Sequence, residues 1–173
     1  MNGFILLLPF FFIRFVVLAF LDKASLQRAA MFAPLKGNEK PAYYIYQLTN
    51  AGIILYPFFL TVKPALSPFF LLGLICYLLG LLLCLVTVAA FASPGENGLN
   101  TDGIYRFSRN PMYVSYFFCF LGIALLTRSL LLLGVVLLFQ VSGHFIILSE
   151  ERWCREKFGA AYEEYCRKVR RYI

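Results

Sequence analysis

Long hydrophobic runs separated by short polar segments form the main pattern along this chain. A helix that crosses a membrane needs about 20 largely apolar residues, with roughly 17 as the lower limit. The run from 111 to 148 is too long for one crossing, and Thr127-Arg128-Ser129 interrupts it near its middle. The pattern therefore predicts an all-α protein with five transmembrane helices, the last two forming a tight hairpin. Their expected bounds are 4–21, 44–62, 69–91, 111–127 and 130–148.

Composition supports a membrane location. Hydrophobic residues make up 61% of the chain and charged residues 14%, whereas soluble domains usually carry about 25% charged residues. The first run is too long for the apolar core of a signal peptide, and no basic residue precedes it, so we expect a retained first helix. Because no linker divides the 173 residues, we expect one domain, 1–173.

The lysines and arginines are distributed unevenly over the loops. If five helices alternate in direction, the loops 22–42 and 92–110 and the tail after 148 share one side and carry thirteen of the 16 basic residues. Lys63 and Arg128 lie on the other side. By the positive-inside rule, the first side is cytoplasmic, with the N-terminus outside and the C-terminus inside. Attraction to anionic membrane lipids, roughly 1 kcal/mol per basic residue, then accounts for the net charge of +7 without nucleic acid as a partner.

Other features of the chain have ordinary structural interpretations. The five cysteines contain no CxxC pair and predict neither a disulfide framework nor a zinc site. After Ser149, we expect a new charged amphipathic helix that lies on the cytosolic membrane surface, with Trp153 and Phe158 among acids and bases. A stripe of mostly small side chains in the third run favours close helix packing over a ligand groove. Its members are Gly73, Tyr77, Gly80 and Cys84.

A compact polar segment, GIYRFSRNPMYV at 103–114, interrupts the hydrophobic sequence between the third and fourth runs. Pro111 suits the first position of a helix, where its missing N–H costs nothing, and Asn110 is a candidate N-cap. One interpretation is a well-made loop and helix start with tyrosines at the membrane interface. The other is a functional pocket, and the pattern of this segment alone favours the first.

An acid pair, Glu150-Glu151, follows the fifth run on the same predicted face as the polar segment. Acids in the first turn of a new helix favour its dipole by about 0.3 to 1 kcal/mol, which is the ordinary interpretation. If the last two helices form a hairpin, however, their cytosolic ends lie side by side. The acid pair and the segment 103–114 could then line one pocket.

The ordered combination of these motifs resembles a known family. The stretch GIYRFSRNPMY, a hydrophobic helical pair, and EERWCREKFGAAYEEYCRKVRRYI are similar to the C-terminal signature of integral membrane methyltransferases. These include isoprenylcysteine carboxyl methyltransferases and phospholipid N-methyltransferases. The signature reads G-x-Y, R-H-P-x-Y, a helical pair, E-E, F-G, Y and V-x-R-Y/F, and the resemblance covers about 95–173. It implies a multi-pass membrane enzyme that transfers a methyl group from S-adenosylmethionine to a lipid or lipid-like acceptor at the cytosolic face.

The resemblance also implies roles for individual residues. Arg109 and Glu151 brace the site and are its candidate catalytic residues, and Glu150 meets the cofactor. The faces of Tyr105 and Tyr113 suit the sulfonium cation of the cofactor, and the Glu150 carboxylate suits its hydroxyl or amine donors. Arg109 suits the carboxylate of the cofactor. The full set of expected cofactor-binding residues is Asn97, Gly98, Leu99, Asn100, Tyr105, Asn110, Pro111, Met112, Tyr113 and Glu150.

Three positions depart from the family pattern. Asn110 replaces the usual histidine, so a group that titrates near neutral pH is lost while hydrogen bonding is kept. Ser115 replaces a glycine. Ile146 stands where isoprenylcysteine enzymes place an arginine thought to serve the substrate, and this leaves the acceptor, and whether its oxygen, nitrogen or sulfur is methylated, open.

Two other interpretations of the whole chain compete with a methyltransferase. Membrane sterol reductases resemble the same C-terminal region but use NADPH, and a small membrane adaptor would bind anionic lipid through its basic tail. His144 is either a proton shuttle or, as we favour, a histidine that is hydrogen-bonded inside the bundle. Arg14, halfway along the first run, needs a polar partner, and its role is equally structural or functional. The expected partners are Gln47, Asn50, Gln140 or water.

Overall fold

The computed structural model describes residues 1–37, 39–64, 67–95 and 98–173. These residues form helices and no β-sheet, which confirms the expected all-α class. Short 3-10 or π-helical turns occupy Gly3–Leu6, Phe12–Val17, Tyr56–Phe59 and Gly103–Arg106. The α-helices are α1 Leu7–Phe11, α2 Leu18–Leu21, α3 Lys23–Ala30, α4 Glu39–Leu55, α5 Pro68–Phe91, α6 Pro111–Thr127, α7 Leu130–Phe158 and α8 Ala160–Lys168.

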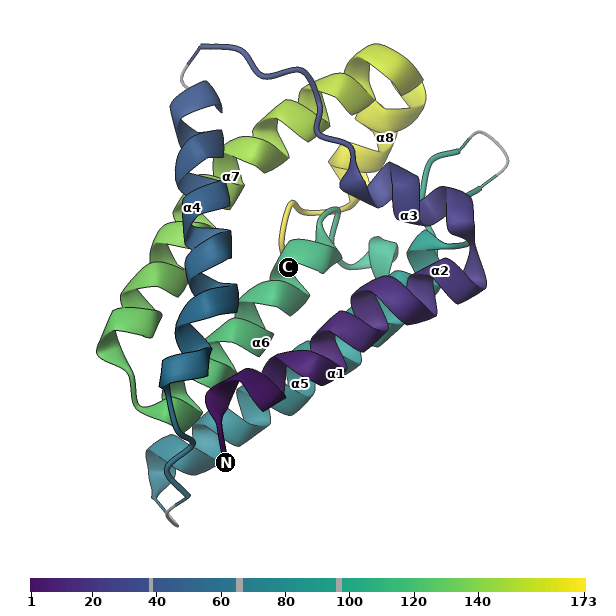
Figure 1. Cartoon of the computed structure of the whole chain (residues 1–173). Coiled ribbons are helices and arrows are strands. Elements are labelled where there is room, and N and C mark those ends of the chain that lie inside the picture. The colour runs from purple at the N-terminus through teal and green to yellow at the C-terminus, as the bar shows by residue number, and fades with distance from the viewer. Residues whose placement is uncertain (38, 65–66, 96–97) are drawn as a thin grey trace.

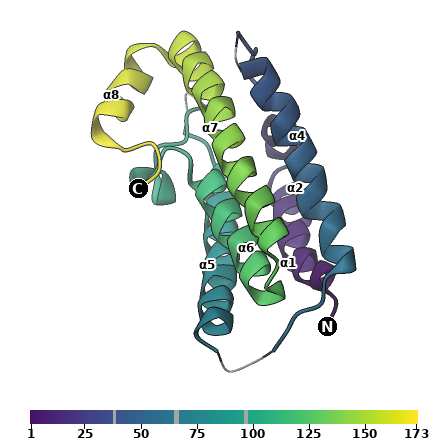
Figure 2. The ribbon, with the colours of Figure 1, turned by 90° about the vertical axis from the view of Figure 1, so that its left-hand side faces the viewer.

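Helices α5 and α6 lie against each other in the bundle, with α1 beside α5 and with α4 beside α7 (Figures 1 and 2). Glycines bring α5 and α6 close together. A Cβ atom on Gly80 would lie 2.3 Å from the Cys119 nitrogen, and one on Gly122 would lie 2.5 Å from the Tyr77 nitrogen. The stripe expected in the third run therefore serves close helix packing.

Within the described part of the chain, three helices are long and apolar enough to cross a membrane: Gly3–Leu21, Pro68–Phe91 and Leu130–Phe158. Helix α6 is apolar but has only 17 residues. The first of the three is a composite in which 3-10, α and π turns follow one another without a break from Gly3 to Leu21. It ends at Asp22, whose carboxylate accepts hydrogen bonds from the first turn of α3 and so caps that helix.

The second expected helix, 44–62, differs from the observed one. Helix α4 begins five residues earlier, at Glu39, and ends at Leu55, and a 3-10 turn follows it over Tyr56–Phe59. Pro57 explains the early end, because a proline disfavours helical geometry in the residue before it and cannot donate a helical hydrogen bond. The chain beyond the turn is extended, and Val62 N donates to Met1 O at 2.9 Å.

Several long-range contacts gather at the end of the bundle that holds the N-terminus (Figures 1 and 2). Lys63 N donates to Leu126 O at 3.2 Å, and Arg128 Nη2 donates to Ser67 Oγ at 3.1 Å. Lys63 and Arg128, the two basic residues expected to lie apart from the others, are therefore at this one end. Helix α8 lies toward the opposite end in both views.

Helix α7 continues past Leu148 to Phe158, so the expectation of a new helix after Ser149 is wrong. No glycine or proline occurs between 149 and 158, and glutamate and arginine are good helix formers. The helix ends at Gly159, which has a φ of +53°. The interpretation of the acid pair as first-turn residues is wrong as well, and the short amphipathic helix is α8.

Aromatic side chains join the four helices α1, α6, α7 and α4 in the core. Phe10 of α1 meets Phe120 of α6 with ring centroids 5.0 Å apart. Phe120 in turn contacts Phe139 of α7 at 5.7 Å, and Phe139 stacks on Tyr46 of α4 at 4.7 Å. This row of rings holds the helices that carry the polar segment and the acid pair in a defined position.

Candidate functional site

Helix α6 begins at Pro111 and Asn110 occupies its N-cap position, as expected, but the Asn110 side chain makes no capping hydrogen bond. The Asn110 amide nitrogen instead donates to Glu151 Oε1 at 3.4 Å and to Arg171 O at 3.2 Å. The expected N-cap position is therefore confirmed, whereas the side chain does not cap the helix. The side chain is used to connect the start of α6 with α7 and the C-terminal tail.

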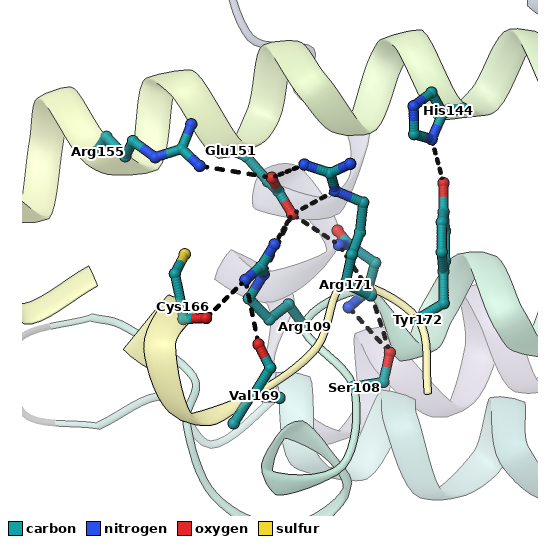
Figure 3. A network of polar contacts seen from close by, with 10 residues as sticks. Ser108, Arg109, His144, Glu151, Arg155, Cys166, Val169, Arg171 and Tyr172 are labelled. Carbon is teal, nitrogen blue, oxygen red and sulfur yellow. Dashed lines mark hydrogen bonds and ion pairs between the residues drawn. The ribbon is translucent and has the colours of Figure 1, made fainter. Parts of the chain in front are cut away.

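Arg109 and Glu151 form the centre of the polar cluster in Figure 3. Arg109 Nη2 lies 2.9 Å from Glu151 Oε1, and the Arg109 Nη1 atom donates to Cys166 O and Val169 O at 3.1 Å each. The Glu151 side chain is only 2% exposed. One guanidinium therefore ties the loop before α6 to α7 and to the end of α8.

Two further arginines surround the Glu151 carboxylate. Arg171 Nη2 donates to Oε2 at 2.8 Å, and Arg155 Nη2 lies 3.8 Å from the same oxygen. Burial by itself would raise the pKa of Glu151, but the hydrogen bonds from Arg171 and Arg109 outweigh it and lower the pKa below its usual value. Glu151 is thus an ionised acceptor whose two oxygens are both engaged.

Glu150 has a different environment from its neighbour. It lies beyond the hydrophobic part of α7, and its Oε1 accepts a hydrogen bond of 2.9 Å from the Tyr113 hydroxyl. None of the ion pairs within the described residues involves Glu150. Burial, chiefly, raises the pKa of Glu150 to about 7; the Tyr113 hydrogen bond opposes this rise and the Glu151 charge adds to it. The pKa values of the two adjacent glutamates are thus shifted in opposite directions, a pattern typical of acid–base sites.

The loop before the polar segment forms one wall of a small pocket of about 180 Å³. Gly98 has a φ of +81°, which only glycine adopts readily. Asn100 Oδ1 is buried and has no hydrogen-bond partner. Asn97, expected to follow the cofactor, lies outside the described residues. The pocket is lined by Ala90, Ser93, Gly95, Asn100, Thr101, Asp102 and Gly103.

The C-terminal segment packs against this loop. Leu99 packs in a small hydrophobic cluster with Tyr162, Tyr165 and Val169. The Tyr165 hydroxyl donates to the carbonyl oxygen of Tyr105 at 2.6 Å, and Tyr105 is itself buried. The position of the loop therefore depends on α8 and the C-terminal tail.

Sequence reasoning did not name Arg171 or Tyr165 as parts of this cluster. The closing V-x-R-Y motif, Val169 to Tyr172, contains Arg171 and was the one signal that could have indicated it. His144 Nδ1 lies 2.6 Å from the hydroxyl of Tyr172 in the C-terminal tail (Figure 3). The histidine is therefore hydrogen-bonded inside the protein, which is the interpretation that we favoured from the sequence.

Arg14 does not contact the partners expected for it. Its Nε donates to the Tyr116 hydroxyl on α6, and its Nη2 donates to Ala29 O at 3.0 Å, at the end of α3. Arg14 Nη1 is buried without a hydrogen-bond partner. The expectation of Gln47, Asn50 or Gln140 fails because the side chain points toward α6 and α3.

The structure brings most of the expected residues to one end of the bundle. Arg109, Asn110 and Glu151 form one connected cluster, and Tyr113 and Glu150 form a pair directly beside it. Pro111 is buried at the start of α6, and Met112 O accepts a hydrogen bond from the Ser115 hydroxyl at 2.7 Å. Cofactor and catalytic roles for these residues remain predictions.

Comparison with protein-family models identifies a related family. Residues 68–161 match the family model described as phospholipid methyltransferase. The matched segment runs from the start of α5 into α8 and covers more than half of the chain. Neither the curated proteins nor the solved structures contain a match to the chain.

Proposed function

The chain belongs to the phospholipid methyltransferase family and is a membrane methyltransferase, and from this premise we propose that it methylates a lipid or lipid-like acceptor with S-adenosylmethionine as donor. The observation that carries the proposal is a pair of contacts at one end of an apolar bundle. Two residues of the segment 103–114 contact the acid pair: Arg109 binds Glu151, and Tyr113 binds Glu150. When bound, S-adenosylmethionine supplies an electrophilic methyl group on a positively charged sulfur.

The side chains present suit that donor. Asn100 Oδ1 is a buried acceptor without a partner, beside a pocket of about 180 Å³. Glu150 supplies a carboxylate for hydroxyl or amine donors, and Tyr113 and Tyr105 supply aromatic faces for a cation, worth about 0.5 to 2 kcal/mol each. We assign the donor to this group of residues, together with Gly98, whose backbone leaves open space where a side chain would stand.

Arg109 and Glu151 act as positioning residues in this proposal. Their pairing, with Arg171 and Asn110, fixes the start of α6 against α7 and the tail. This fixed start holds Tyr113 and Glu150 in one arrangement. Because methyl transfer is an in-line displacement, holding the reactants in line supplies much of the rate.

Glu150 is the group available to accept a proton. An acceptor that reacts through a hydroxyl or a protonated amine must lose that proton, and the Glu150 carboxylate gains it and passes it to solvent. Glu151 is unsuited to this step because its oxygens are already paired with Arg109 and Arg171. An acceptor that is already anionic needs no base.

We further propose that the chain crosses the membrane five times, with the N-terminus outside and the site facing the cytosol. The grouping of Lys63 and Arg128 at the end opposite the polar cluster supports this orientation through the positive-inside rule. The water-soluble donor then reaches the site from the cytosol, and the acceptor reaches it from the bilayer.

Calorimetry with the purified full chain and S-adenosylhomocysteine tests the donor. We expect micromolar binding that Glu150→Gln weakens at least tenfold, while the matched variant Glu163→Gln, at an exposed position of α8, leaves it unchanged. Binding that Glu150→Gln leaves intact would remove Glu150 from the site. Binding of NADPH in place of S-adenosylhomocysteine would favour the reductase alternative, and binding of neither by folded protein would favour the adaptor.

A further inference from the structure

Arg14 is an ionisable residue within the hydrophobic first helix, Gly3–Leu21. It lies in the π-helical turn Phe12–Val17, and such turns occur frequently at functional sites. Phe12 and Phe15 on the same turn are exposed at the surface of the bundle, whereas the Arg14 guanidinium points inward to Tyr116. A charge at this depth is costly unless the bundle interior or a ligand compensates it.

The protein compensates this charge incompletely. The two hydrogen-bond acceptors of Arg14, the Tyr116 hydroxyl and Ala29 O, are neutral, and the guanidinium also lies over the ring of Phe15, 5.8 Å from its centroid. Nη1 is buried with no partner at all. No ion pair among the residues that the structure describes involves Arg14. One donor group of Arg14 therefore has no hydrogen-bond partner, and its positive charge has no anionic partner among these residues.

A row of side chains connects Arg14 with the proposed methyl-transfer site. Tyr116 stands one turn after Tyr113 on α6, and their ring centroids are 6.3 Å apart. The Tyr113 hydroxyl donates to Glu150 at 2.9 Å. The row Arg14, Tyr116, Tyr113, Glu150 thus runs from the hydrophobic first helix to the end of the bundle where the donor is proposed to bind.

On the basis of the proposed function, we propose that Arg14 binds an anionic oxygen group of the methyl acceptor, a carboxylate or a phosphate. A guanidinium binds such groups through paired N–H donors, and here Nη1 supplies a donor that has no other use. The acceptor class is accordingly an anionic amphiphile, with its apolar chain in the bilayer and its charged group beside Tyr116. Residue 14 lies outside the family match, which begins at residue 68, so the family description assigns it no role.

Calorimetric titration of the purified full chain tests this without measuring catalysis. The probes are palmitate, lysophosphatidic acid and the uncharged hexadecanol. We expect Arg14→Gln to weaken binding of an anionic probe at least tenfold and to leave hexadecanol binding unchanged. Arg128→Gln, which removes a charge at the other end of the bundle, is the matched control and should bind all probes as the parent does. Equal affinity of the parent and Arg14→Gln for both anionic probes would overturn the proposal.

Two further measurements keep the test decisive. Arg14→Gln should bind S-adenosylhomocysteine as the parent does, so a loss confined to anionic probes separates this inference from failure of the proposed donor site. Should Arg14→Gln fail to fold, Arg14→Lys keeps the charge but loses the planar fork, and it should bind the same probes severalfold more weakly. A last outcome would also overturn the acceptor assignment. If phosphatidylglycerol displaces the anionic probe from the protein and no bound amphiphile is methylated, the Arg14 site binds a bilayer lipid and not the methyl acceptor.

Discussion

Arg109 and Glu151, 42 positions apart in the chain, form a buried ion pair with 2.9 Å between Nη2 and Oε1. The pair joins the loop before α6 to the charged part of α7, and Arg109 also binds two carbonyl oxygens at the end of α8. Three separate parts of the chain therefore depend on one guanidinium. Breaking the pair tests whether the candidate site is one cooperative structure.

Breaking this pair should strongly destabilise the protein. Glu151→Gln leaves Arg109, whose side chain is only 9% exposed, without its anionic partner, which typically costs about 3 to 5 kcal/mol. Thermal unfolding in detergent measures the effect. Asp102→Asn is the matched control, because the Asp102–Arg106 pair is largely exposed and should contribute less than about 1 kcal/mol. Equal effects of the two variants would show that the cluster does not stabilise the fold.

Acid should destabilise the protein through the same carboxylate. The folded protein holds the pKa of Glu151 below its usual value, so the stabilisation is fully present above about pH 4.5 and is lost as pH falls through the folded pKa. The unfolding temperature should rise as pH falls from about 7 to about 4.5, because Glu150, whose pKa is raised to about 7, takes up a proton in the folded protein. Below about pH 4.5 it should fall, as the contribution of Glu151 is lost. Glu151→Gln should reduce this fall, with the Glu39–Arg152 pair, whose carboxyl pKa is also lowered, responsible for part of the remainder.

The methyl-transfer rate should depend on pH through Glu150 when the acceptor must lose a proton. Burial raises the pKa of Glu150 to about 7, and only the ionised form accepts a proton. The rate should rise with pH through about 7 and then level off. Rate measurements between pH 5.5 and 8.5 check this, and Tyr113→Phe should shift the midpoint upward because the hydrogen bond that favours the charged form is lost. A rate independent of pH would mean that Glu150 accepts no proton.

Glycines at the α5–α6 contact should tolerate no enlargement. A Cβ on Gly80 would stand 2.3 Å from backbone nitrogen of Cys119, so Gly80→Ala forces the helices apart at a cost of about 1 to 3 kcal/mol. Gly134→Ala in α7 meets nothing within 4 Å and should be neutral or slightly stabilising, since alanine is the better helix former. The unfolding temperatures of the two variants check this prediction, because Gly80 lies at a close helix contact and Gly134 faces open space.

Local sequence determined much of the architecture. The hydrophobic run lengths, with Pro111 as a first helical residue, predicted α5 and α6 almost to the residue, as 69–91 and 111–127. The break at Thr127-Arg128-Ser129 likewise predicted the turn before α7, where Arg128 has a φ of +52°. These features depend on neighbours a few residues away, so one sequence suffices to infer them. The resemblance of the C-terminal motifs also identified the family that the match over 68–161 supports.

The partners of the buried polar side chains were decided by the tertiary structure. No periodicity indicates that Asn110 turns from its helix toward Glu151 and Arg171, or that Arg14 reaches Tyr116, 102 residues away. Charged residues after Ser149 fit a continued helix as well as a new one, and the contacts of Glu151 with Arg109 and Arg171 accompany the continued form. Hydrophobic length and proline act within one helix, whereas a buried polar group takes whichever partner the folded bundle brings within hydrogen-bond distance.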